Sequence, residues 1–96
     1  MLTFQVIRII DGDTFDVNPN WQWNGESGSR IRPTGYDATE VGTTGGATAT
    51  AKLASLILGR SVQLGNAYRI DRGRLVCDVY FNGHNLANYF RSRALS

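Results

Sequence analysis

The chain has 96 residues, 42% hydrophobic and 19% charged, which indicates one folded domain spanning residues 1–96 and excludes a disordered chain. No apolar run approaches bilayer-spanning length, no leader segment is visible, and a single cysteine, Cys77, excludes an internal disulfide. The net charge of +2 combines −3 over residues 1–40 with +5 over residues 41–96, and nine of the ten basic residues are arginine.

Arginine presents a planar fork that matches phosphate oxygens two at a time, so this charge is compatible with a polyanionic partner. A solvated surface that happens to use arginine explains the charge equally well.

The first two predicted strands flank an acidic turn. Residues 2–10 alternate apolar and polar side chains, and residues 14–17 resume the same pattern. Between them, the run Asp11-Gly12-Asp13 is a strong hairpin signal, because glycine accommodates a tight turn. The same two carboxylates could hold a cation, and this stretch alone favours the turn.

A third strand is predicted before Pro33, which lacks the amide hydrogen needed to continue a ladder. The dipeptides at 24–25 and 27–28 have the chemistry of turns. Arg30 and Arg32 are two residues apart, so both guanidinium groups should leave the same side of this strand.

The second half predicts helices and two further strands. Residues 35–46 have loop composition, and residues 47–58 have helical apolar spacing with glycine just past the end. Residues 62–64 and 75–81 predict strands, and His84 or Asn85 could cap a last helix that continues to about residue 93. We expect a mainly β, α+β fold: a five-stranded OB-type barrel with two helices.

Four segments occur in the order and at nearly the spacing of blocks in one known family: RIIDGDTFDV, RIRPTGYDATEVG, ATATAKLASLILGRSVQL and DRGRLVCDVYFNGHNLANYFRSRAL. From about residue 6 to 95 the chain therefore resembles the staphylococcal-nuclease-like (thermonuclease) family. In that family an OB-type barrel binds one calcium ion and cleaves phosphodiester bonds of DNA and RNA. The resemblance implies a Ca²⁺ cofactor and nucleic acid as the substrate, and we expect a monomer without a protein partner or membrane attachment.

The resemblance also implies the metal ligands. Asp13 and Asp37 match the two carboxylate ligands of the family, and the backbone carbonyl of Ala38 matches the third. Oxygen ligands of this kind suit a hard cation such as Ca²⁺. Asp11 would lie nearby and could act through water. Taken one at a time, each aspartate is explained as well by a turn or loop.

Three further positions match the catalytic residues of the family. Glu40 matches the general base, which abstracts a proton from the attacking water or positions that water. Arg32 and Arg74 match two arginines that stabilise charge on the phosphate oxygens. Residues 71–74 are one residue shorter than in the family, which leaves open where Arg74 points. Solvated surface positions are the alternative explanation for all three.

A calcium-dependent nuclease is therefore the leading hypothesis. The alternative is a catalytically silent OB-type module that binds single-stranded nucleic acid, and the third is a structural or protein-binding domain. The chain ends at Ser96 before the third helix of the family, so we expect weak base preference, with stacking from Tyr36, Tyr68 or the tryptophans. The resemblance allows a secreted or periplasmic location without deciding it.

Overall fold

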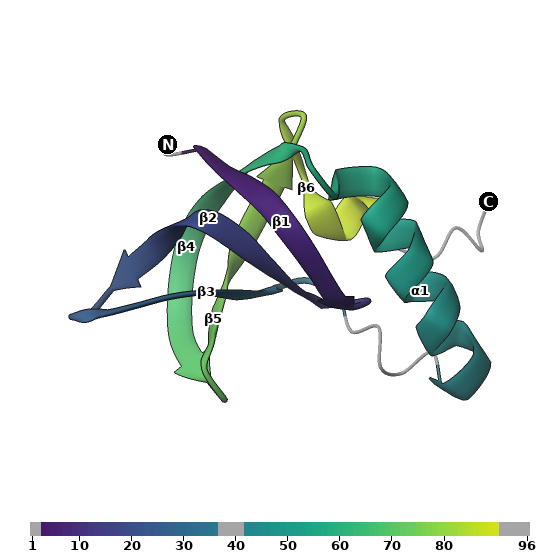
Figure 1. Cartoon of the computed structure of the whole chain (residues 1–96), viewed down its shortest axis with the longest axis horizontal. Coiled ribbons are helices and arrows are strands. Elements are labelled where there is room, and N and C mark those ends of the chain that lie inside the picture. Colours follow the sequence, from purple (N-terminus) through teal and green to yellow (C-terminus); the bar gives the residue numbers. More distant parts are fainter. Residues whose placement is uncertain (1–2, 37–41, 91–96) are drawn as a thin grey trace.

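The computed structural model describes residues 3–36 and 42–90 (Figure 1). In chain order its elements are β1 (Thr3–Asp11), β2 (Thr14–Trp23), β3 (Glu26–Pro33), α1 (Gly42–Ile57), β4 (Ser61–Asp71), β5 (Arg74–Phe81), β6 (His84–Asn85) and the 3₁₀ helix η2 (Leu86–Tyr89). Most of the described residues lie in strands, and α1 is the one α-helix among them.

The strands close into a barrel. They are hydrogen-bonded in the order β3-β2-β1-β4-β5-β6, and β3 also pairs with β5. That last pairing is parallel, with Ile31 opposite Leu75 and Pro33 opposite Cys77, whereas the other pairings are antiparallel. The result is a closed, mixed barrel of β1 to β5, which confirms the expected mainly β fold and is consistent with an OB-type barrel.

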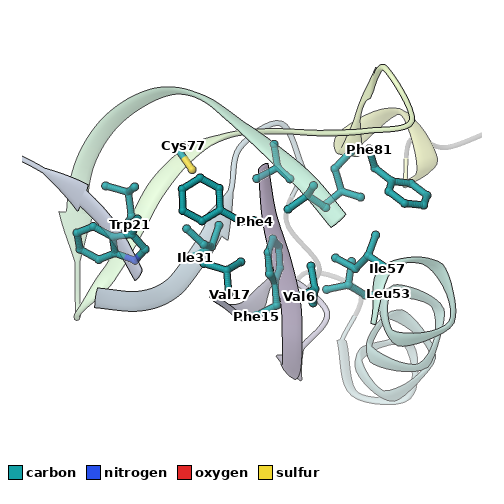
Figure 2. Packing of buried hydrophobic residues seen from close by; sticks show 14 residues of the cluster. Phe4, Val6, Phe15, Val17, Trp21, Ile31, Leu53, Ile57, Cys77 and Phe81 are labelled. Carbon is teal, nitrogen blue, oxygen red and sulfur yellow. The ribbon is translucent and has the colours of Figure 1, made fainter. Parts of the chain in front are cut away.

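The core fills this barrel and continues under the helix (Figure 2). Phe15, Ile31 and Val79 have no exposed surface, and neither do Leu53 and Ile57, through which α1 packs on the barrel. Burying side chains of this size is the main stabilising contribution in a small domain without disulfides.

The helices differ from the prediction. α1 begins at Gly42, five residues before the predicted start, and ends before Gly59, whose φ of 80° suits glycine as a helix stop. The expected second α-helix is wrong within the described residues, where only the single 3₁₀ turn η2 follows β6. Asn85 caps η2 as proposed, since its Oδ1 accepts a hydrogen bond of 2.8 Å from the amide of Ala87.

β3 and β4 are longer than predicted, because each contains a glycine inside the strand. Gly28 lies within β3 rather than in a turn, and a Cβ there would come within 2.9 Å of the Trp21 ring. In β4, which continues well past the predicted end at residue 64, a Cβ on Gly65 would approach the Tyr80 ring to 2.8 Å. Both glycines make room for an aromatic side chain across the sheet. The predicted turn at 24–25 is confirmed, with positive φ at both residues.

Cys77 lies on β5 with no exposed surface, and burial raises the pKa of its thiol to about 12. A buried thiol of this kind has low reactivity. Within residues 3–36 and 42–90, no helix has the length and apolar character needed to span a bilayer.

Candidate active site at the β1–β2 turn

The acidic turn is both tight and irregular. Asp11 pairs with Thr14 across the hairpin, and the register shifts between Ile9 and Asp11, as at a β-bulge. Inside the turn, the amide of Asp13 donates a hydrogen bond of 3.1 Å to Oδ1 of Asp11. Local aspartate–amide bonds and bulges of this kind redirect side chains out of the regular alternation of a strand. Here they turn the Asp13 carboxylate inward.

Asp13 is buried, with an exposed fraction of only 1%. Its Oδ1 accepts a hydrogen bond of 3.3 Å from the Thr14 hydroxyl. Its Oδ2 is also buried and has no hydrogen-bond partner among the described residues. A carboxylate oxygen in this position is costly, because burial removes its hydration and no hydrogen bond replaces it.

Arg32 faces this carboxylate from β3. Its Nη2 lies 3.4 Å from Oδ2 of Asp13, which is within ion-pair distance but is not a well-formed hydrogen bond. Its Nη1 donates a weak bond of 3.4 Å to the carbonyl of Pro33. The Arg32 side chain is about one-fifth exposed, whereas that of Asp13 is almost fully buried.

Arg74 reaches the same turn from the start of β5. Its Nη1 donates 3.2 Å to the Thr14 hydroxyl, which in turn donates to Asp13. Its Nη2 pairs with Oδ2 of Asp71 at 2.8 Å, and its Nε donates 3.3 Å to the Asp71 carbonyl. With the short turn at 71–74, Arg74 thus reaches the Thr14 hydroxyl, next to Asp13.

The electrostatics of the turn follow from this arrangement. Burial raises the pKa of Asp13 above its usual value, and the neighbouring carboxyl group of Asp11 adds to the increase. The positive charge of Arg32 acts in the opposite direction without cancelling it. The site therefore holds a carboxylate that would gain from an additional positive charge.

Tyr36 and Thr14 are neighbours of the turn that the sequence did not single out for these roles. The Tyr36 hydroxyl donates 3.0 Å to the carbonyl of Gly12, and its ring stacks on Phe90 with centroids 4.3 Å apart. Burial raises the pKa of Tyr36. The contact of Thr14 with the site could have been predicted from its position directly after Asp13, at the start of a strand. No feature of the sequence could have predicted that Tyr36 bonds to Gly12.

The other predicted site residues, Asp37, Ala38 and Glu40, lie outside the described residues. Within the part of the chain that the structure describes, no three His, Cys, Asp or Glu side chains are grouped so that they could hold an ion. The structure thus brings together Asp13, Arg32 and, through Thr14, Arg74.

Asp13 is compatible with a hard cation, because it offers a buried carboxylate oxygen that has no hydrogen-bond partner among the described residues. Carboxylate oxygens are ligands that such an ion takes. Asp11 flanks the same turn and adds negative charge.

Several other candidates have different roles. Arg30 forms a fork onto Asp16, with Nε 3.0 Å from Oδ1 and Nη2 3.3 Å from Oδ2, so it ties β3 to β2. Trp21 is buried and donates 2.9 Å from Nε1 to the Arg30 carbonyl, which removes it as a stacking platform for a base. Tyr68 is exposed, with its hydroxyl donating to Asp78 at 2.9 Å.

Comparison with known proteins does not identify the chain: no protein-family model matches it, and no curated protein is significantly similar to it.

Proposed function

We propose that this protein is a calcium-dependent nuclease that hydrolyses phosphodiester bonds of DNA, with RNA as the second candidate substrate, as its resemblance to the staphylococcal-nuclease-like family implies. The observation that carries the proposal is the buried Asp13 carboxylate. Its Oδ2 has no hydrogen-bond partner among the described residues, and the Arg32 guanidinium lies 3.4 Å from it. A lone turn aspartate would be hydrated, whereas this one is buried beside an arginine.

Asp13 would hold the ion together with Asp37 and the carbonyl of Ala38, the positions that match the family. Calcium at such a site supplies Lewis-acid polarisation of a phosphate oxygen. With so few protein ligands, the remaining positions are left to water and substrate, so we expect weak binding that tightens when a nucleotide is present.

Each residue of the site has its own role in the hydrolysis. Water attacks the phosphorus, a new P–O bond forms, and the bond to the leaving sugar oxygen breaks. Glu40 holds this water and accepts its proton, while the leaving oxygen is protonated from solvent. Arg32 and Arg74 stabilise the negative charge that builds on the phosphate oxygens. The contacts of Arg74 with Thr14 and Asp71 would keep its guanidinium in place for this role.

The test is cleavage of plasmid and single-stranded DNA at high protein concentration, with calcium and then with a chelator. We expect cleavage that stops on chelation. Glu40→Gln should lose most of the activity while keeping the fold. Arg32→Lys should lose roughly a hundredfold or more, the usual consequence of removing a fixed donor from a phosphate transition state.

Arg30→Lys is the matched control, because Arg30 lies two residues away on β3 but binds Asp16 instead of Asp13. It should keep nearly full activity. Absence of chelator-sensitive cleavage would refute the nuclease proposal. Salt-sensitive DNA binding that ignores calcium would instead indicate the silent single-strand-binding module.

A further inference from the structure

A hydrogen bond from a distant part of the chain reaches the backbone of the acidic turn. The Tyr36 hydroxyl donates 3.0 Å to the carbonyl of Gly12, across 24 residues of sequence. Gly12 lies between Asp11 and Asp13, so this bond fixes the peptide that joins the two carboxylates. The bonds from the Asp13 amide and from the Thr14 hydroxyl are local, and Arg74 contacts the turn only through the Thr14 side chain.

Tyr36 is itself held firmly. Its ring lies parallel to that of Phe90, with centroids 4.3 Å apart and an angle of 5° between the planes. Lys52 of α1 places its Nζ 4.9 Å from the centroid of the Phe90 ring, within cation–π distance. Phe90 follows η2, so the stack connects the end of the described chain and the helix to the turn. A donor that is anchored in this way can hold its acceptor in one position.

We propose that Tyr36 is a positioning residue that fixes the Asp11–Asp13 turn and thereby sets the affinity of Asp13 for calcium. The inference rests on the proposed function, because it takes Asp13 as a calcium ligand. Groups that orient metal ligands without touching the metal commonly change metal affinity by about 10- to 100-fold when they are removed. A tyrosine that served only the core would affect stability and leave calcium affinity unchanged.

The test compares Tyr36→Phe with Tyr89→Phe in the full chain. Phenylalanine at 36 keeps the ring that stacks on Phe90 and removes only the hydroxyl. Tyr89 is the matched control because its hydroxyl also donates to a backbone carbonyl, that of Phe81, at 3.2 Å. Each protein is titrated with calcium by calorimetry, and its unfolding free energy is measured without calcium.

We expect about tenfold weaker calcium binding in Tyr36→Phe and unchanged binding in Tyr89→Phe, with similar small losses of stability in both. Cleavage by Tyr36→Phe should recover at saturating calcium, since the catalytic groups remain. In the calcium-free protein, exchange of the Asp13 amide hydrogen should be faster in Tyr36→Phe than in Tyr89→Phe, because the turn opens more often.

Equal calcium affinity in Tyr36→Phe and wild type overturns the inference and leaves the nuclease proposal intact. Equal weakening in both variants also overturns it, since loss of any tyrosine hydroxyl would then suffice. If the wild-type protein binds no calcium, with or without a nucleotide bisphosphate, the proposed function fails and the inference fails with it.

Discussion

Burial of the Asp13 carboxylate destabilises the folded protein, and the same burial favours the binding of a cation there. In the absence of a cation, burial raises its pKa, so its ionised form is less stable in the folded protein than in the unfolded chain. A carboxyl group whose pKa is higher in the folded protein stabilises the fold fully at pH values below its pKa in the unfolded chain. This contribution to stability is lost as the pH rises through its pKa in the folded protein.

Replacing Asp13 by Asn should therefore stabilise the calcium-free protein at neutral pH, by on the order of 1 kcal/mol, while abolishing calcium binding. The difference between variant and wild type should shrink as pH falls, because the wild-type carboxyl group becomes protonated. Denaturant unfolding between pH 4 and 7 measures this. A variant less stable than wild type at every pH would show that the pair with Arg32 outweighs the burial of the carboxylate.

Single residues of the site were the easiest part to predict. The turn chemistry of residues 11–13 and the spacing of Arg32 are local properties of the sequence, and the structure places both groups together. The contact of Tyr36 with Gly12 spans 24 residues and depends on where the chain that leaves β3 passes the β1–β2 turn, so no local pattern could reveal it.

At the scale of elements, the β4–β5 hairpin decides where Arg74 points. Asp71 pairs directly with Arg74, and the two residues between them have positive φ, 55° at Arg72 and 81° at Gly73. Two consecutive residues of this kind form the tight turn that matches the twist of the flanking strands. A two-residue connection therefore delivers Arg74 to the first position of β5, in register with its partner strand.

Arg72 is the strained member of this turn, since a left-handed conformation is unfavourable for a long side chain but tolerated by asparagine. Arg72→Asn should raise the free energy of unfolding by about 0.5–1 kcal/mol. DNA cleavage should change little, because Arg74 keeps its bonds to Thr14 and Asp71. Thermal unfolding and the plasmid assay measure the two effects, and a fall in stability would contradict this account of the turn.

Element boundaries were harder to predict than element types. Gly28 and Gly65 look like turn residues in the sequence, but each lies in a strand against an aromatic ring of the neighbouring strand. The information that distinguishes these cases is the identity of the cross-strand neighbour, which is fixed only when the sheet has formed. The early start of α1 likewise falls in a glycine- and threonine-rich stretch with weak helical preference.

For the whole molecule, closure of the barrel is the feature that assembles the candidate site. The parallel pairing of β3 with β5 joins segments more than 40 residues apart and brings Arg32 and Arg74 to the same side of the barrel wall as the β1–β2 turn. The order of strands and helix along the chain was enough to predict this architecture, because few small folds have that order.

Ile31 lies at this closure, opposite Leu75 and fully buried. Ile31→Ala should lower the free energy of unfolding by roughly 2–5 kcal/mol, through lost burial and the cavity left behind. Denaturant titration followed by far-ultraviolet circular dichroism measures the loss. A change below about 1 kcal/mol would mean that the β3–β5 seam contributes little to the fold.

Because Cys77 is buried at the centre of β5, the rate of its alkylation reports how often the barrel opens. Its sulfur is shielded from reagents, and its thiolate form is scarce because the pKa is about 12, so alkylation must wait until the strands separate. In excess alkylating reagent, the rate of Cys77 labelling then measures how often the strands around it separate, and the protein needs no engineered cysteine. If calcium binds as proposed, adding it should slow this labelling, and Asp13→Asn should remove the calcium dependence.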